Sequence, residues 1–237
     1  MYRSPLPIIA TLVTFLAVVI MFTLGLWQLQ RADEKSQRLA AIELAAVSAP
    51  LSLSTAMALK DEARDFPIHF EGTAQSTKYF LLDNRIQQGQ VGYEVIVPVK
   101  SALGEVLVNF GWVAAPALRS DLPLVSISGV EKEYQGMLAI PLKNSLISET
   151  AIFDQQWPKV VQQIDISLMA QHYEQTLMPF VILLNKDTDT EYLRNWQPVV
   201  MKPEKHIAYA IQWFLLAGAA PIIFIIAQRR RKSREVK

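Results

Sequence analysis

Two long apolar segments lie near the two ends of the sequence. No residue from Ser4 to Gln30 carries a charge, and residues 8–29 alone would form a helix of about 33 Å, enough to cross the ~30 Å hydrocarbon core of a bilayer. Residues 206–227 form a second apolar run, which contains Pro221, a residue that membrane helices tolerate. A cleaved secretory signal has an apolar core of only about 7–15 residues. The pattern therefore predicts two uncleaved transmembrane helices.

Between the two spans the pattern changes first to a helix and then to short strands. Leu39, Ile42 and Ala46 recur at helical spacing, so we expect the first helix to continue to about Ala46. From Phe66 onward, β-branched and aromatic residues in short runs separated by turn signals predict strands. These strands are expected at residues 66–74, 78–86, 91–99, 104–113, 130–140, 159–166 and 180–184, with a further candidate at 198–201.

Two local features refine this central segment. The glycines of G-Q-V-G, residues 89–92, predict a hairpin turn, and SLMAQHYEQ predicts a short helix with Ser167 as its N-cap. The expected fold class is a membrane protein with two transmembrane α-helices flanking a mostly β extracytoplasmic domain. That domain is expected to be antiparallel, α+β in class, and barrel-like or sandwich-like.

The distribution of basic residues predicts the orientation. Arg229, Arg230, Arg231, Lys232 and Arg234 follow the second span directly, and basic flanks tend to stay in the cytoplasm. Both termini are then cytoplasmic, and the central segment is translocated. The expected division is a cytoplasmic N-terminus (1–7), transmembrane helix 1 (8–29), a helical extension and linker (30–65), an extracytoplasmic mainly β domain (66–205), transmembrane helix 2 (206–227) and a basic cytoplasmic tail (228–237).

Composition and charge exclude several classes of function. Hydrophobic residues make up 51% of the chain and charged residues 19%, which favours a chain partly embedded in lipid. Residues 31–205 carry 16 Lys and Arg against 21 Asp and Glu, a net charge of −5, so no nucleic-acid partner is expected. The chain has no cysteine, which excludes thiolate catalysis, disulfides, iron–sulfur clusters and thiolate metal sites.

No catalytic motif is recognisable, and we expect no enzyme. The sequence has no G-x-S-x-G elbow, no phosphate-binding Gly-rich loop and no dinucleotide fingerprint. Asp187, Asp189 and Glu191 lack the glycine and distal glutamate of an EF-hand loop, so a solvated turn is the better interpretation. Of the three histidines, His69 and His172 are interpreted as ordinary strand and helix residues.

His206 differs because it opens the second span, in KHIAYAIQWF. A polar group in or near the hydrocarbon is costly without a partner, so this imidazole is a functional candidate. The first span ends in GLWQLQR at the same expected membrane depth, and Gly25 would let the two helices pack closely. The predicted result is an apolar, aromatic-walled cleft that suits a flat molecule with acidic substituents, such as haem. Its candidate binding residues are His206, Trp27, Tyr209, Trp213, Gln28, Gln212 and Arg31. The alternative for the aromatic residues is an interfacial anchoring belt.

At these motifs the chain resembles the surfeit-locus-one family of cytochrome c oxidase assembly proteins, in its bacterial form. Three signatures carry the resemblance: GLWQLQR (residues 25–31), the pair GYEVIVP (92–98) and VNFGWV (108–113), and HIAYAIQWF (206–214). They occur in the family's order and span nearly the whole chain. One position departs from the family pattern, because Phe110 stands where an arginine is usual.

The resemblance implies a non-enzymatic assembly factor that binds haem a transiently, with His206 as the axial ligand of the haem iron. Haem a synthase would be the donor, and the catalytic subunit of cytochrome c oxidase the recipient. The alternative is a membrane scaffold that stabilises an oxidase assembly intermediate without binding haem. Only Arg3 precedes the first span, where a mitochondrial presequence would be rich in Arg and Ser, so we expect a bacterial inner membrane.

Overall fold

The computed structural model describes residues 6–118, 120–147, 149, 156–186, 192–196 and 201–235. The chain divides into two compact units: a helix pair (residues 1–41 and 197–237) and a β domain (residues 42–196).

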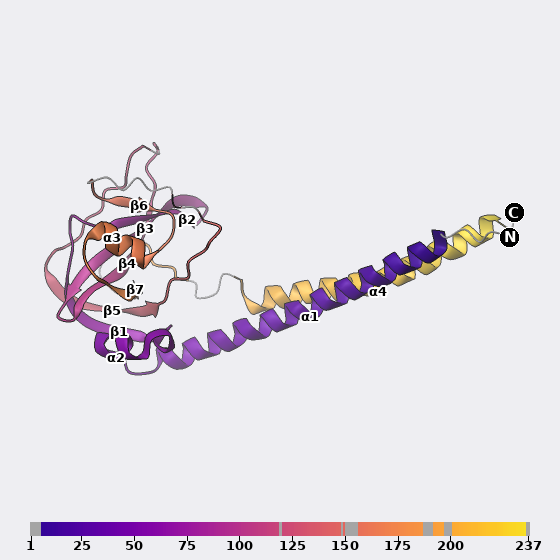
Figure 1. Ribbon diagram of the computed structural model, residues 1–237, viewed down its shortest axis with the longest axis horizontal. Coiled ribbons are helices and arrows are strands. Elements are labelled where there is room, and N and C mark those ends of the chain that lie inside the picture. Colours follow the sequence, from indigo (N-terminus) through magenta and orange to yellow (C-terminus); the bar gives the residue numbers. More distant parts are fainter. Residues whose placement is uncertain are drawn as a thin grey trace. The chain divides into compact units, whose positions relative to one another are not determined.

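The helix pair consists of most of α1 (Leu6–Ala46) and of α4 (Pro203–Glu235). Both helices are long and apolar enough to cross a membrane, by length and composition. The two expected spans lie within them, and α1 ends at Ala46, as its helical spacing predicts. Figure 1 shows the two helices lying side by side. They run antiparallel, because Gln28 meets His206 while Phe22, earlier in α1, meets Phe214, later in α4.

The β domain is built on one mixed seven-stranded sheet. Its strands are β1 (Pro67–Ala74), β2 (Phe80–Gln87), β3 (Gln90–Ser101), β4 (Gly104–Ala114), β5 (Glu131–Ala139), β6 (Lys159–Val161) and β7 (Leu177–Leu184). All seven coincide with predicted strands, although β6 covers only the start of its predicted segment. The candidate strand at 198–201 lies almost wholly outside the described residues.

The order of the strands closes the sheet on itself. The order is β1-β5-β7-β4-β3-β2-β6, and β1 also pairs with β3 through Thr73–Lys100 and Ala74–Val99. The expectation of a purely antiparallel sheet is wrong at two places, since β4–β7 and β2–β6 are parallel pairs. In both pairs the partners are far apart in sequence, so no local turn signal reveals their direction.

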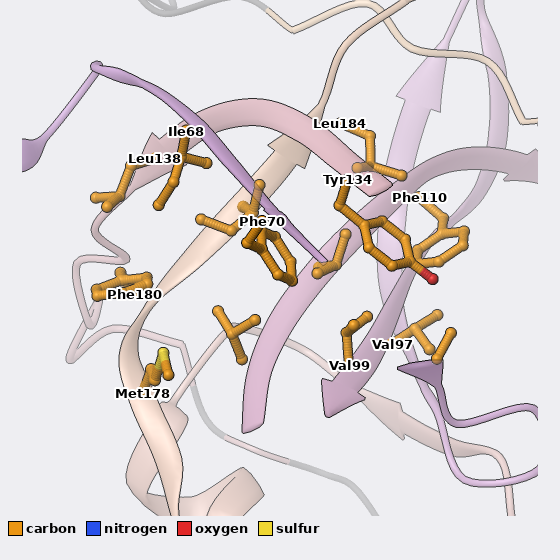
Figure 2. Close-up of a cluster of buried hydrophobic side chains, with 14 of the residues drawn as sticks. Ile68, Phe70, Val97, Val99, Phe110, Tyr134, Leu138, Met178, Phe180 and Leu184 are labelled. Carbon is orange, nitrogen blue, oxygen red and sulfur yellow. The ribbon is translucent and has the colours of Figure 1, made fainter. Parts of the chain in front are cut away.

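Two hydrophobic clusters lie on the two faces of the central strands. The first contains Phe70, Val97, Phe110, Tyr134 and Phe180, and Figure 2 shows their side chains converging. The second lies beneath α3 (Ile166–Tyr173) and includes residues of β2, β3, β4, β6, β7 and that helix: Phe80, Leu82, Ile96, Leu107, Val161, Met169, Tyr173, Leu177 and Val181. Because both faces are covered, these strands read as nearly continuous apolar runs.

Local signals explain the connections. The β2–β3 hairpin turns at Gln88 and Gly89, whose φ angles of 51° and 80° fit a tight two-residue turn, which confirms the predicted hairpin. Helix α3 is capped by Asp165, whose carboxylate accepts the Leu168 N–H at 3.2 Å, so the prediction of Ser167 as its N-cap is wrong. Helix α2 (Leu53–Leu59), capped by Ser52, and the 3₁₀ turn η1 (Lys60–Ala63) lie in the segment expected to be a linker.

Candidate functional site

Close packing between α1 and α4 brings the first and last sequence signatures together. A Cβ atom at Gly25 would lie 2.5 Å from the Phe214 ring, so only glycine leaves room for that ring at its present position. The ring of Phe214 also lies 5.4 Å from that of Phe22, centroid to centroid. The expectation that Gly25 permits close packing of the helices is confirmed.

His206 meets Gln28 at this helix contact. Its Nδ1 lies 2.7 Å from Gln28 Oε1, and the imidazole is buried, with 8% of its surface exposed. A side-chain carbonyl oxygen can only accept a hydrogen bond, so Nδ1 must be the donor and carry a proton. A neutral imidazole then has its lone pair on Nε2.

The second ring nitrogen of His206 has no hydrogen-bond partner among the described residues. Nε2 of His206 is buried and makes no hydrogen bond to any part of the chain that the structure describes. Buried polar atoms usually have hydrogen-bond partners, so a buried nitrogen with a free lone pair calls for an explanation. The arrangement leaves one unused nitrogen ligand at the start of the second candidate membrane span.

The other predicted site residues form no hydrogen bond with this pair in the described part of the chain. Trp27 and Tyr209 are 52% and 43% exposed, Gln212 is exposed, and Trp213 is half-buried. Arg31 forms an ion pair with Glu34, with 2.6 Å between Nη1 and Oε2. Within residues 6–118 and 201–235, His206 and Gln28 are thus the two predicted site residues that the structure joins by a hydrogen bond.

An apolar groove opens elsewhere on the helix pair. It has a volume of about 480 Å³ and is lined by Val18, Phe22, Phe214, Ala217 and Gly218. Phe214 lies eight residues beyond His206, or about 12 Å along α4. This groove could not be predicted from the sequence, because its lining residues do not stand out from an ordinary apolar span.

The middle signature, in contrast, forms part of the architecture of the β domain. Val95 pairs with Gly111 and Ile96 with Asn109, so Phe110 is the extra residue of a β-bulge. The Asn109 oxygen accepts the Gly111 N–H at 3.1 Å, and its amide nitrogen donates to the Glu94 carboxylate at 2.7 Å. Gly111 has a φ of +126°, a conformation that L side chains rarely adopt.

Phe110 points into the first cluster, where its ring lies 6.1 Å from that of Tyr134 (Figure 2). Its carbonyl oxygen accepts a hydrogen bond of 2.8 Å from Nε of Arg194, a buried residue whose Nη1 also donates to the Asn185 carbonyl at 2.6 Å. Burial lowers the pKa of Arg194. The position that departs from the family pattern is therefore occupied here by a core residue.

Three buried side-chain atoms in the described part of the β domain also lack hydrogen bonds, but none resembles the free nitrogen of His206. Arg85 Nε lies 3.8 Å from a Glu94 carboxylate oxygen. Glu105 Oε2 belongs to a carboxylate that the Tyr173 hydroxyl contacts. The Tyr134 hydroxyl is enclosed in the core, where burial raises the pKa of Tyr134 to about 12.

The acidic and histidine side chains of the described residues form no metal site. Within the described residues, no group of three or more His, Asp or Glu side chains is arranged to hold a metal ion. Asp187, Asp189 and Glu191, interpreted from the sequence as a solvated turn, lie outside the described residues. His69 is bonded to Glu133 on the outer face of β1 and β5.

Comparison with known proteins identifies the family. The model of the SURF1 family matches residues 15–218, which include all three signatures and most of the chain. The chain belongs to the SURF1 family. This confirms the resemblance drawn from the signatures. None of the curated proteins compared with the chain matches it.

Family membership establishes the broad role of the chain. The SURF1 family is known for the assembly of cytochrome c oxidase, and it is a family of assembly factors rather than of catalysts. The two apolar helices agree with a membrane protein.

Proposed function

We propose that this SURF1 protein binds haem a through Nε2 of His206 and aids its insertion into the catalytic subunit of cytochrome c oxidase. The observation that carries the proposal is the buried, unpartnered Nε2 in a helix pair that belongs to an oxidase assembly family. Neutral imidazole is a common axial ligand of haem iron, which it binds through such a lone pair.

A single nitrogen fits haem better than it fits a bare metal ion. A structural zinc site needs about four protein ligands, whereas the porphyrin supplies four nitrogens of its own and leaves only axial positions to the protein. The described residues contain no cluster of three or more metal-ligating His, Asp or Glu side chains. One histidine in apolar surroundings is therefore a donor set that suits haem.

The burial of Nε2 favours a temporary attachment. Iron can reach this nitrogen only if the groups that cover it move apart, because less than 1 Å² of the atom is exposed. An assembly factor has to release its cargo, and a ligand nitrogen that is covered again when these groups return favours release.

The other predicted site residues would complete the site. Trp27, Tyr209 and Trp213 offer aromatic surface for the macrocycle, and Gln212 offers an amide to its polar substituents. Arg31 can bind a propionate bidentately if it exchanges its present partner, Glu34.

The proposed setting follows the orientation of the spans. The basic residues after the second span favour cytoplasmic termini, and we propose that the protein lies in a bacterial inner membrane with its β domain in the periplasm. Haem a synthase would supply the cofactor, and the β domain would dock on oxidase subunits.

Optical spectroscopy of the purified full chain, coexpressed with the enzymes of haem a synthesis, tests the proposal. We expect wild-type protein to carry a Soret band and His206→Asn protein to carry little or none. Asparagine is the informative replacement, because its amide N–H can still donate to Gln28 while the Nε2 ligand is lost.

His69→Ala is the matched control, since it removes a histidine that lies outside the helix pair. It should bind as much haem as the wild type. Colourless wild-type protein, or equal haem in wild-type and His206→Asn proteins, would contradict the proposal. Either result would favour the alternative, a scaffold that stabilises an oxidase intermediate without holding haem.

A further inference from the structure

The contact between Gln28 and His206 determines which nitrogen of the imidazole carries the proton. A neutral imidazole carries one proton, on either Nδ1 or Nε2, and the nitrogen without the proton is the metal ligand. Gln28 Oε1 lies 2.7 Å from Nδ1, and Nε2 has no hydrogen-bond partner in the described part of the chain. The two observations together specify the Nδ1–H tautomer.

We propose that Gln28 is a positioning residue that holds the proton of His206 on Nδ1 and so keeps the Nε2 lone pair available. This inference rests on the proposed function, because the lone pair is kept for haem iron. The sequence indicated Gln28 only as a candidate binding residue of the predicted cleft, and the structure gives it a specific contact. Here the Gln28 oxygen is engaged by the imidazole.

The physical effect is twofold. Imidazole in water favours the Nε2–H tautomer, which cannot bind a metal through Nε2, so an acceptor at Nδ1 is needed to reverse this preference. The same hydrogen bond fixes the rotation of the ring and makes the ligating nitrogen more basic, as partners of metal-bound histidines generally do. Burial strengthens the bond, because water does not compete at this site.

Gln212 provides a matched comparison. It is the second amide of the predicted site, but it is exposed and has no hydrogen bond to His206. Replacing either glutamine with methionine keeps the side-chain length and removes the carbonyl acceptor. Gln28→Met should change which ring nitrogen of His206 carries the proton, and Gln212→Met should not.

The first test needs no haem. The full-length protein, labelled with ¹⁵N-histidine and reconstituted in lipid nanodiscs, contains three histidines, and the His206→Asn variant identifies the signals of His206. We expect the ¹⁵N shifts of the wild type at neutral or mildly alkaline pH to show a protonated Nδ1 and a bare Nε2. In Gln28→Met the proton should move largely to Nε2, whereas Gln212→Met should retain the wild-type pattern. An Nε2–H tautomer in the wild type, or an unchanged pattern in Gln28→Met, overturns the inference.

The second test measures haem affinity. Loss of a hydrogen-bond partner of a metal-bound histidine typically weakens metal binding by about 10–100-fold, and we expect a loss of this size in Gln28→Met. Gln28→Glu keeps an acceptor at Nδ1 and should restore affinity to near the wild-type value. Equal affinities of wild-type and Gln28→Met proteins overturn the inference while leaving haem binding intact. Absence of binding in the wild type overturns the proposed function instead, and the tautomer measurement then decides the role of Gln28 alone.

Discussion

In β4, the amide of Asn109 bonds to both the Gly111 N–H and the Glu94 carboxylate, whereas in α4 the imidazole of His206 uses only one of its two ring nitrogens. Both residues belong to sequence signatures of one family. Trp112 resembles Asn109, because its indole N–H donates to the Arg85 carbonyl at 2.8 Å.

This difference separates two reasons for a sequence signature. In the β domain, the signature side chains satisfy the backbone around a bulge, and their hydrogen bonds explain why those residue types are needed. In the helix pair, the signature leaves a metal-binding atom unused. We interpret the signature of the β domain as architectural and the signature that contains His206 as functional.

The largest loss of folding stability is expected from a substitution in the β-bulge of β4. Gly111→Ala forces a side chain into a backbone conformation with a φ of +126°, and its Cβ would lie 2.8 Å from Cβ of Tyr192. Such strain costs about 1–3 kcal/mol, and the clash places this variant at or above the upper end. Chemical unfolding of the full chain in detergent, followed by tryptophan fluorescence, measures the loss.

Gly104→Ala is the control for this substitution. Its φ is +125°, but the new Cβ would approach only Met178 Cε, at 3.9 Å. It should therefore show the strain without the clash. Equal losses for the two variants would contradict an architectural role for the close approach at Gly111.

Substitution of Gly25 at the contact between α1 and α4 should lower folding stability less, but it should specifically change the His206 site. Gly25→Leu collides with the Phe214 ring, whereas at Gly218 no atom of the described residues lies within 4 Å of a new Cβ. Overpacking of this kind costs about 1–3 kcal/mol, here in helix association. The ¹⁵N signals of His206 and the haem content of the protein should change in Gly25→Leu. Both should remain at wild-type values in Gly218→Leu. The same behaviour in both variants would argue against the observed helix packing.

Helix α3 provides a test of the β domain by pH. Asp165 accepts the Leu168 N–H and pairs with Lys143 at 2.7 Å, and the hydrogen bond from Lys143 is the main reason why the pKa of its carboxyl is lowered. Asp165→Ala should destabilise the β domain by about 1 kcal/mol, the usual effect of losing an N-cap. Asp165→Asn keeps the cap and should cost less.

The direction of the pH effect follows from the lowered pKa. The ionised carboxylate is favoured in the folded state, so its contribution is complete above the ordinary pKa of 3.8 and is lost as the pH falls through the folded value. The stability of Asp165→Asn should therefore decline less steeply below about pH 4 than that of the wild type. Parallel pH profiles would contradict this assignment.

The smallest effect is expected from the exposed pair of His69 and Glu133. Their side chains are 41% and 57% exposed, and pairs of this kind contribute less than about 1 kcal/mol. His69→Ala should therefore alter neither unfolding nor haem content beyond this margin. A loss of haem in this variant would place a functional histidine in the β domain. It would contradict the assignment of function to the helix pair and architecture to the β domain.

The sequence predicted the elements better than their arrangement. The spans and the seven strands follow from apolar periodicity, and Gly25 was identified as a point of close packing. The parallel β4–β7 pair was not predicted, because its direction depends on contacts distant in sequence. The cap of α3 was misplaced by two residues, since Asp165 and Ser167 are both good caps and only the structure shows which one bonds to Leu168.

The candidate site was predicted as a set of residues without its geometry. His206 and Gln28 were both selected for their places at the ends of the spans, but helical spacing does not show which atoms meet. The free nitrogen became apparent only with the hydrogen bond at Nδ1. The middle signature lies in the β domain, and its hydrogen bonds depend on a bulge that the strand pattern does not reveal.

Pulsed electron paramagnetic resonance of the ferric haem complex tests the central claim most directly. In ¹⁵N-histidine-labelled full-length protein, the account predicts a hyperfine coupling from an axial imidazole nitrogen in the wild type and in His69→Ala and His172→Ala. Any haem that the His206→Asn protein retains should lack this coupling. A histidine coupling that persists in His206→Asn, or that is missing from the haem-loaded wild type, would contradict the assignment of His206 as the iron ligand.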